Sequence, residues 1–289
     1  MNRWLSLGML MMFVFINSQQ IAIDFPKFAG KAYDFIIFQG NKSEVVTKGT
    51  IPTDGKFILQ IPKEKSPYIG MARWLITGTR EGGGVDVFIP GRNFSISCLD
   101  SLPDKNNIIY NNNEDDHLLN SLYEEQISIY NRYTLIGQVL KVFPKTNKNY
   151  KLFNQEYNNQ RIDFEQFQSK LLNRNDYIGQ LIQVINLTNG IDFKLNEDTK
   201  VNAKIINEYI SEKLNWQYLY TSGYWGILIT VWVNIHIKIL SDLDLFAKAF
   251  SSISSKMSSP LLRNSFQEYV KNYLNQQGNQ NYANRLNYH

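Results

Sequence analysis

The sequence has few of the residues on which redox and metal sites depend. Cys98 is the only cysteine among 289 residues, which excludes an internal disulfide, a CxxC redox pair and a cysteine-rich zinc site. The histidines are His117, His236 and His289, and no two of them have i, i+4 or HxH spacing. None lies in an HExxH motif. We therefore predict no metal site.

Charged residues are also scarce, at 19% of the chain. The formal net charge of +4 is spread along the chain, without a run of five or more Lys or Arg and without a basic stripe interleaved with aromatic residues. Nucleic-acid binding requires a concentrated basic surface, so nucleic acid is not an expected partner. The hydrophobic content of 43% is sufficient for a sizeable core.

The N-terminus has the pattern of a secretory signal peptide. Arg3 precedes an apolar run, Trp4 to Ile16, which is followed by polar residues. Thirteen residues suit a signal sequence and are fewer than the roughly 20 that span a bilayer. We predict a signal peptide over residues 1–18, with Ala22 as an alternative cleavage position, and an exported protein of the periplasm or cell envelope. The alternative is an N-terminal core helix.

Residues 19–110 are predicted to form a β domain. Short runs rich in aromatic and β-branched residues recur at the spacing typical of an antiparallel sandwich or barrel. The runs cover residues 33–38, 44–51, 56–61, 68–77, 85–89 and 94–98. Asp54-Gly55 marks a turn, because glycine accepts a positive φ. Gly82-Gly83-Gly84 lacks the Lys-Ser/Thr pair of a phosphate-binding loop and is predicted to be a hairpin loop.

The composition changes at residues 111–116, and the apolar period becomes helical. We predict an α-helical region over residues 111–278, interrupted at Pro144, and a polar, frayed tail over 279–289. Asp115 or Asp116 is placed to cap the first helix. Residues 223–240 are apolar enough to resemble a membrane span, but Asn234 and His236 favour a buried amphipathic helix, with a strand over 234–239 as the alternative. We expect no transmembrane segment after signal cleavage.

No residue has a clear catalytic or cofactor-binding pattern. Cys98 shares a strand face with Phe94 and Ile96, which predicts a buried, unreactive thiol. His117 is expected to be a solvated first-turn residue and His236 a semi-buried ring. The sequence also lacks a GxSxG motif. We therefore predict no catalytic, cofactor-binding or metal-binding residue.

Several short motifs carry a family resemblance. They are Gly30 with the following aromatic strand, Gly49-Thr50-Ile51, Asp54-Gly55-Lys56-Phe57, Tyr68-Ile69-Gly70-Met71, the glycine-rich turn before Val85, and Tyr220-Thr221-Ser222-Gly223-Tyr224-Trp225. Across residues 20–275 the chain resembles the N-terminal domain of unknown function, with its helical linker, of secreted Gram-negative thiol-disulfide oxidoreductases. Those proteins are of the alkyl-hydroperoxide-reductase/thiol-specific-antioxidant, thioredoxin-like type.

The resemblance implies no catalytic residue for this chain. The family's chemistry depends on a Trp-Cys-x-x-Cys segment on a thioredoxin fold, and the single cysteine here cannot supply it. We expect this thioredoxin domain to be missing, since the sequence reaches His289 where the domain would begin.

These observations lead to an α+β protein with an antiparallel β-sandwich-like domain and an α-helical region. Its expected function is that of an exported, non-catalytic accessory or binding protein. Its expected partner is a separate thioredoxin-like protein or a second copy of itself. Alternatives are a truncated relic of a thioredoxin-like oxidoreductase, a small-molecule binder or enzyme with a site in the helical region, and a chaperone-like surface of aromatic residues.

Overall fold

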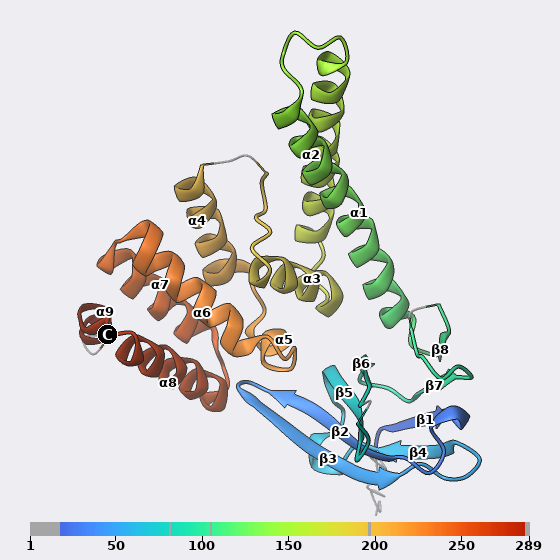
Figure 1. The fold of residues 1–289 in the computed structure, drawn as a ribbon. Coiled ribbons are helices and arrows are strands. Elements are labelled where there is room, and N and C mark those ends of the chain that lie inside the picture. Colours follow the sequence, from blue (N-terminus) through green and yellow to red (C-terminus); the bar gives the residue numbers. More distant parts are fainter. Residues whose placement is uncertain (1–17, 81, 105, 196–197, 287–289) are drawn as a thin grey trace, which may run out of the picture.

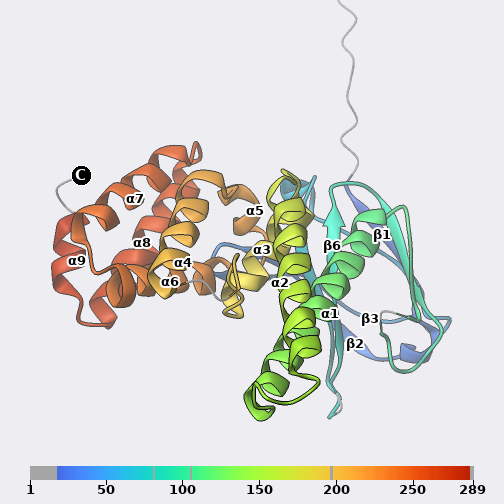
Figure 2. The same ribbon diagram turned by 90° about the horizontal axis from the view of Figure 1, so that it is seen from above.

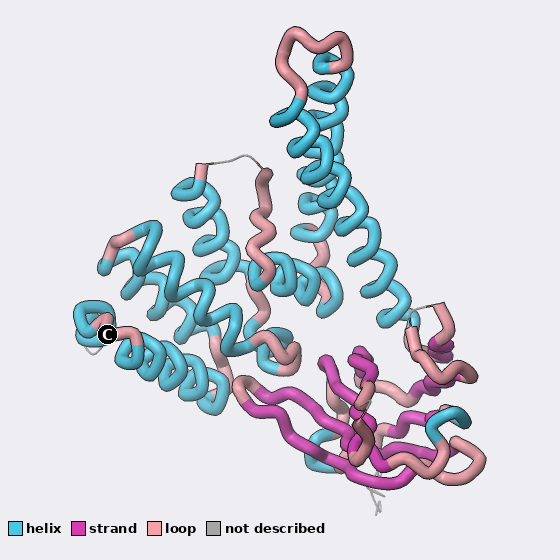
Figure 3. The backbone as a smooth tube through the Cα atoms, viewed as in Figure 1, coloured by secondary structure: helices cyan, strands magenta, loops and turns pink. Residues whose placement is uncertain are grey.

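The computed structural model describes residues 18–80, 82–104, 106–195 and 198–286. The predicted signal peptide, apart from Ser18, and His289 lie outside these ranges. The fold is α+β, as predicted, with strands gathered in the N-terminal part and helices in the remainder (Figure 3). Among the described residues no helix combines the length and the apolar character that crossing a bilayer requires.

Two four-stranded sheets form the β-sandwich (Figure 1). The strands are β1 (Gln20–Asp24), β2 (Ala32–Gln39), β3 (Lys42–Thr50), β4 (Lys56–Gln60), β5 (Ile69–Thr77), β6 (Gly84–Pro90), β7 (Phe94–Cys98) and β8 (Ile108–Asn111). One sheet has the order β4-β1-β7-β8 and the other β3-β2-β5-β6. All pairs are antiparallel except β1 and β7. Strand alternation builds the core: Tyr33, Phe35 and Ile37 of β2 are buried between the sheets.

The predicted strands are confirmed within one or two residues at their ends, and two further strands are present. β8 has only four residues, too few for an alternating pattern to be visible. β1 follows directly after the predicted signal peptide and lies between β4 and β7. The glycine-rich hairpin loop is also confirmed, since it connects β5 and β6, and Gly82 and Gly83 adopt φ values of 60° and 118°.

The helical region begins with a hairpin of two long helices that projects from the rest of the molecule (Figure 1). The helices are α1 (Glu114–Val142), α2 (Tyr150–Leu172), α3 (Tyr177–Thr188), α4 (Thr199–Glu208), α5 (Trp216–Tyr220), α6 (Trp225–Ile235), α7 (Leu243–Lys256), α8 (Pro260–Gln276) and α9 (Gln280–Arg285). α7, α8 and α9 lie at the end opposite the sandwich, with α3 and α5 between them (Figure 2).

The apolar segment 223–240 is helical and buried, as predicted. Trp225, Leu228 and Trp232 of α6 are completely buried at the centre of the C-terminal helices. A π-helical turn, His236–Leu240, follows α6, and another, Tyr209–Lys213, follows α4. The structure contains no strand at 234–239.

The C-terminal tail is more ordered than predicted, and the β-to-α connection is packed against the sandwich. α9 forms inside the predicted frayed tail, because Ala283 and Leu286 are apolar and pack into the core. The polar segment 111–116 is not a solvated linker, since the side chains of Asn113 and Asp116 are buried. Helical periodicity does begin here, but the two parts of the chain are packed against each other.

Candidate functional site

Two of the motifs that carry the resemblance meet where the sandwich joins the helices. The backbone N–H of Met71, in β5, donates to the carbonyl oxygen of Thr221 at 2.9 Å. The buried hydroxyl of Tyr68 lies 3.3 Å from the same oxygen. The backbone N–H of Gly40, in the β2–β3 turn, donates to the carbonyl oxygen of Tyr220 at 2.7 Å. These backbone contacts hold the residues after α5 against the end of the second sheet.

Close packing at this junction requires glycine at position 70. A Cβ on Gly70 would lie 2.5 Å from the Cβ of Thr221. The hydroxyl of Thr221 lies 3.4 Å from the hydroxyl of Tyr177 in α3, and the Tyr177 ring packs on Phe88 of β6. Burial raises the pKa of Tyr177, which keeps its hydroxyl neutral. The junction is therefore a packed structural joint.

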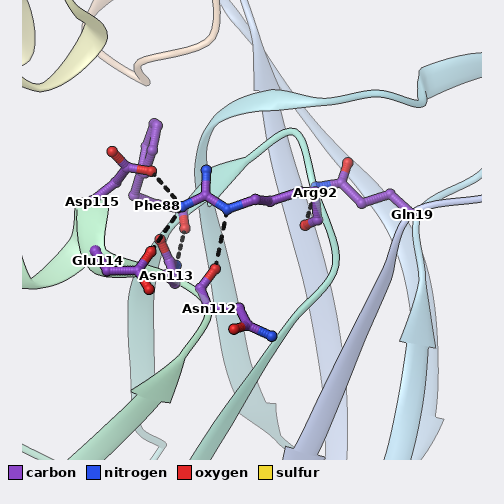
Figure 4. A network of polar contacts seen from close by, with 7 residues as sticks. All are labelled: Gln19, Phe88, Arg92, Asn112, Asn113, Glu114 and Asp115. Atoms are coloured by element: carbon purple, nitrogen blue, oxygen red, sulfur yellow. Dashed lines mark hydrogen bonds and ion pairs between the residues drawn. The ribbon is translucent and has the colours of Figure 1, made fainter.

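A second contact joins the turn after β6 to the start of α1 (Figure 4). The Arg92 guanidinium pairs with the carboxylates of Glu114 and Asp115 at 3.1 and 3.0 Å. The carbonyl oxygen of Arg92 accepts a hydrogen bond from the Gln19 side chain at 3.1 Å. Gln19, Arg92 and the start of α1 thus form one polar network across the sandwich.

The acidic residues at the start of α1 do not cap the helix as predicted. Asn113 occupies the N-cap position without a side-chain cap bond. The Asp116 carboxylate accepts a hydrogen bond from the backbone N–H of Phe88 at 3.2 Å, and the Asn113 amide donates to the Phe88 carbonyl oxygen at 2.8 Å. β6 is an edge strand, so its exposed backbone groups favour these side-chain partners. Burial raises the pKa of Asp116.

The candidate residues from the sequence lie on separate elements. Cys98, in β7, is buried inside the sandwich, where its Sγ lies 3.4 Å from Oδ1 of Asn107. His117 is exposed on the first turn of α1 and meets Tyr110 edge to face. His236 lies at the end of α6. Within the described ranges no three His, Cys, Asp or Glu side chains are grouped to hold a metal ion.

His236 is buried in a polar cluster rather than semi-buried. Its Nε2 lies 2.7 Å from Oδ1 of Asn207, which also accepts from the indole N–H of Trp232 at 3.0 Å. Because Asn207 Oδ1 is an acceptor, this contact places the proton of the neutral ring on Nε2. Nδ1 has no hydrogen-bond partner among the described residues. Burial lowers the pKa of His236 to about 4. The ring therefore stays neutral and structural near pH 7.

A surface cleft between α7 and α8 is the candidate binding site. It is open to solvent and has a volume of about 550 Å³. Its lining consists of Phe250, Ser251, Ser254, Ser255, Arg263, Gln267, Lys271 and Leu286. Both charged side chains in this lining are basic, and the others offer hydroxyl and amide groups. The cleft therefore presents hydrogen-bond donors and positive charge, the chemistry that binds carboxylates and phosphates.

Hydrogen bonds hold two of the side chains that line the cleft. One guanidinium nitrogen of Arg263 donates to the carbonyl oxygen of Met257 at 2.9 Å, which fixes the side chain. Its Nε is buried and has no hydrogen-bond partner among the described residues. The Gln267 amide reaches Ser254 Oγ at 3.3 Å across the cleft.

Sequence reasoning missed this cleft, although its residues have a detectable pattern. Arg263, Gln267 and Lys271 are spaced i, i+4 and i+8, which places them on one helix face. Ser251, Ser254 and Ser255 share a face of the preceding helix. The meeting of these two faces depends on the packing of α7 against α8.

No family model, curated protein or solved structure matches the chain.

Proposed function

We propose that the protein is an exported accessory protein of the cell envelope that binds a partner and performs no thiol chemistry itself. The observation that carries this proposal is the cleft between α7 and α8, which Arg263 and Lys271 line together with hydroxyl and amide side chains. None of the eight lining residues is His, Cys, Asp or Glu. The lining thus supplies donors for an anion but lacks a usual general base.

The thiol and the resemblance support the same function. Cys98 is 1% exposed, so a reactant has little access to its sulfur while the sheets stay packed. Redox chemistry would then belong to a partner, and the resemblance implies a separate thioredoxin-like protein. In this proposal an acidic group of that partner occupies the cleft.

The direct test is calorimetric titration of the mature protein with a thioredoxin-like protein from the same envelope. We expect saturable binding that weakens about tenfold in Lys271→Gln, as a charge-assisted contact is lost. Lys200→Gln, an exposed change on α4, is the matched control and should bind normally. Absence of binding by the wild-type protein contradicts the accessory function. Binding that Lys271→Gln leaves unchanged rules out the cleft as its site.

A second candidate function, binding of a small anionic molecule, is favoured by the size of the cleft. About 550 Å³ lies within the usual range of roughly 300–1,000 Å³ for small-molecule sites. Thermal unfolding in the presence of phosphate and of di- and tricarboxylates would detect such a ligand as a rise in Tm that Lys271→Gln reduces. No rise with any of these anions contradicts this candidate.

A further inference from the structure

The α1–α2 hairpin has two unlike halves. Near its base, Phe164 and Phe167 of α2 are buried against α3. The amides of Gln126 and Asn186 pair there at 2.5 and 2.7 Å and tie α1 to α3. These contacts anchor the base, so the outer half is carried by helices that are held firmly at one end.

The outer half of the hairpin is uncovered. Between Tyr133 and Gln160 no residue is buried. Leu135, Val142 and Leu152 are 60%, 78% and 64% exposed. The turn between α1 and α2 projects away from the sandwich and from α7 and α8 (Figure 1). Large aliphatic side chains therefore gather on an exposed surface at the far end of the molecule.

The tip is also rigid enough to present these side chains. The rings of Tyr133 and Tyr157 stack with centroids 4.6 Å apart, and their hydroxyls lie 2.6 Å from each other. Phe143 and Phe153 pack at 5.1 Å where the hairpin turns. These aromatic pairs join the two helices without covering Val142 or Leu152.

The charge of the tip has one sign. Residues 126–155 contain Arg132, Lys141, Lys145, Lys148 and Lys151 and no Asp or Glu. The rest of the chain has 25 Lys and Arg against 26 Asp and Glu, from totals of 30 and 26. Residues 126–155 therefore form a positively charged segment, while the remainder of the chain is close to neutral.

We propose that the tip of the α1–α2 hairpin docks on the surface of a bilayer that contains anionic phospholipid. Val142 and Leu152 enter the boundary between headgroups and acyl chains, next to Phe143. Lys141, Lys145, Lys148 and Lys151 contact the anionic headgroups, and lysine stems can lie along apolar surface while their ammonium groups reach phosphate.

The side-chain chemistry favours a bilayer over other anionic partners. The three most exposed apolar side chains described at the tip are aliphatic and offer no ring on which a nucleic-acid base stacks. The cations of residues 141–151, at the turn, are all lysines, which act as point charges and lack the planar fork of arginine that recognises individual carboxylates or phosphates. A fluid surface of many headgroups suits this arrangement.

The test is co-sedimentation of the mature protein with phosphatidylcholine vesicles, with or without an equal part of phosphatidylglycerol. We expect binding only when phosphatidylglycerol is present and loss of binding as salt rises. The pair Lys145→Gln with Lys148→Gln should weaken binding roughly thirtyfold, since each lysine near an anionic surface contributes roughly fivefold. The matched control is Lys200→Gln with Lys248→Gln, two exposed lysines on α4 and α7.

Insertion has its own readout. Val142→Ser with Leu152→Ser should weaken vesicle binding without a change in Tm, because both side chains are exposed. In Phe143→Trp, the fluorescence emission of the new indole should shift to shorter wavelength on phosphatidylglycerol vesicles. Brominated acyl chains should quench this emission.

Three results would overturn the inference. The first is no binding to anionic vesicles at low salt, and the second is an equal loss of binding in the control pair. The third is binding to soluble polyglutamate that is as tight as binding to vesicles, together with no shift in the Trp emission on vesicles. The third result would mean that the tip binds an acidic protein instead of a bilayer. The inference is independent of the proposed partner, and Lys271→Gln should leave vesicle binding intact.

Discussion

The backbone N–H of Met71 donates a hydrogen bond to the carbonyl oxygen of Thr221, 150 residues further along the chain, at 2.9 Å. This bond joins the end of the sandwich to the helical region, and the adjacent Gly70 allows the close approach. The motifs around Tyr68 and Tyr220 thus have a common structural role, which their separation in the sequence conceals.

The junction makes a direct prediction for Gly70→Ala. The added Cβ would lie 2.5 Å from Thr221 Cβ, so the two parts must move apart, and we expect a loss of about 2–3 kcal/mol in the free energy of unfolding. In the control, Gly78→Ala, the Cβ meets nothing within 4 Å, and only the φ of 73° costs about 1 kcal/mol. Urea unfolding measures both, and equal losses would contradict the packed junction.

The buried position of His236 leads us to expect that the free energy of unfolding depends on pH. The imidazole has a pKa of about 6.5 in the unfolded chain and of about 4 in the folded protein. Burial lowers this pKa, and the negative charge of Asp242 offsets only part of the effect. Stability is therefore complete above pH 6.5 and falls as the pH drops toward 4, by about 3 kcal/mol at the lower limit. His236→Gln, which keeps a donor for Asn207, should flatten this part of the profile. Parallel profiles for the two proteins in urea unfolding would refute the assignment.

Burial of Cys98 predicts slow reaction with thiol reagents. Its side chain lies inside the sandwich and contacts Asn107, so a reagent reaches it only after the sheets open. Labelling should be slow for the native protein and fast after denaturation, as followed by mass spectrometry. Rapid native labelling, together with peroxide consumption that Cys98→Ser abolishes, would reverse this conclusion.

The position of β1 refines the prediction for signal cleavage. Oε1 of Gln19 accepts from the backbone N–H of Tyr68 at 3.0 Å, and β1 lies between β4 and β7. Cleavage after Ser18 preserves both features, whereas cleavage after Ala22 removes half of an internal strand. We expect N-terminal sequencing of envelope material to begin at Gln19. A terminus at Ile23, or intact Met1 recovered from the cytoplasm, would be the contrary result.

The sequence by itself determined the local elements of this protein. Strand alternation such as Phe94, Ile96 and Cys98 predicted both β7 and its buried thiol, and both are confirmed. Helical spacing predicted the helical region and its interruption at Pro144, and the Asp54-Gly55 turn follows from the positive φ that glycine accepts. These features depend on neighbours within a few residues, so their signal is contained in short windows.

Only the tertiary structure decided where polar and charged side chains act. Asp116 has the sequence position of a helix cap, yet it bonds to Phe88 because the folded chain brings the exposed edge of β6 beside α1. Arg263 acquires its cleft from α7, and Lys141 and Lys151 come to the same end of the hairpin because α1 ends at Val142 and α2 begins at Tyr150 and runs back. Contacts between distant segments depend on how whole elements pack, and side-chain periodicity within one element does not specify its neighbour.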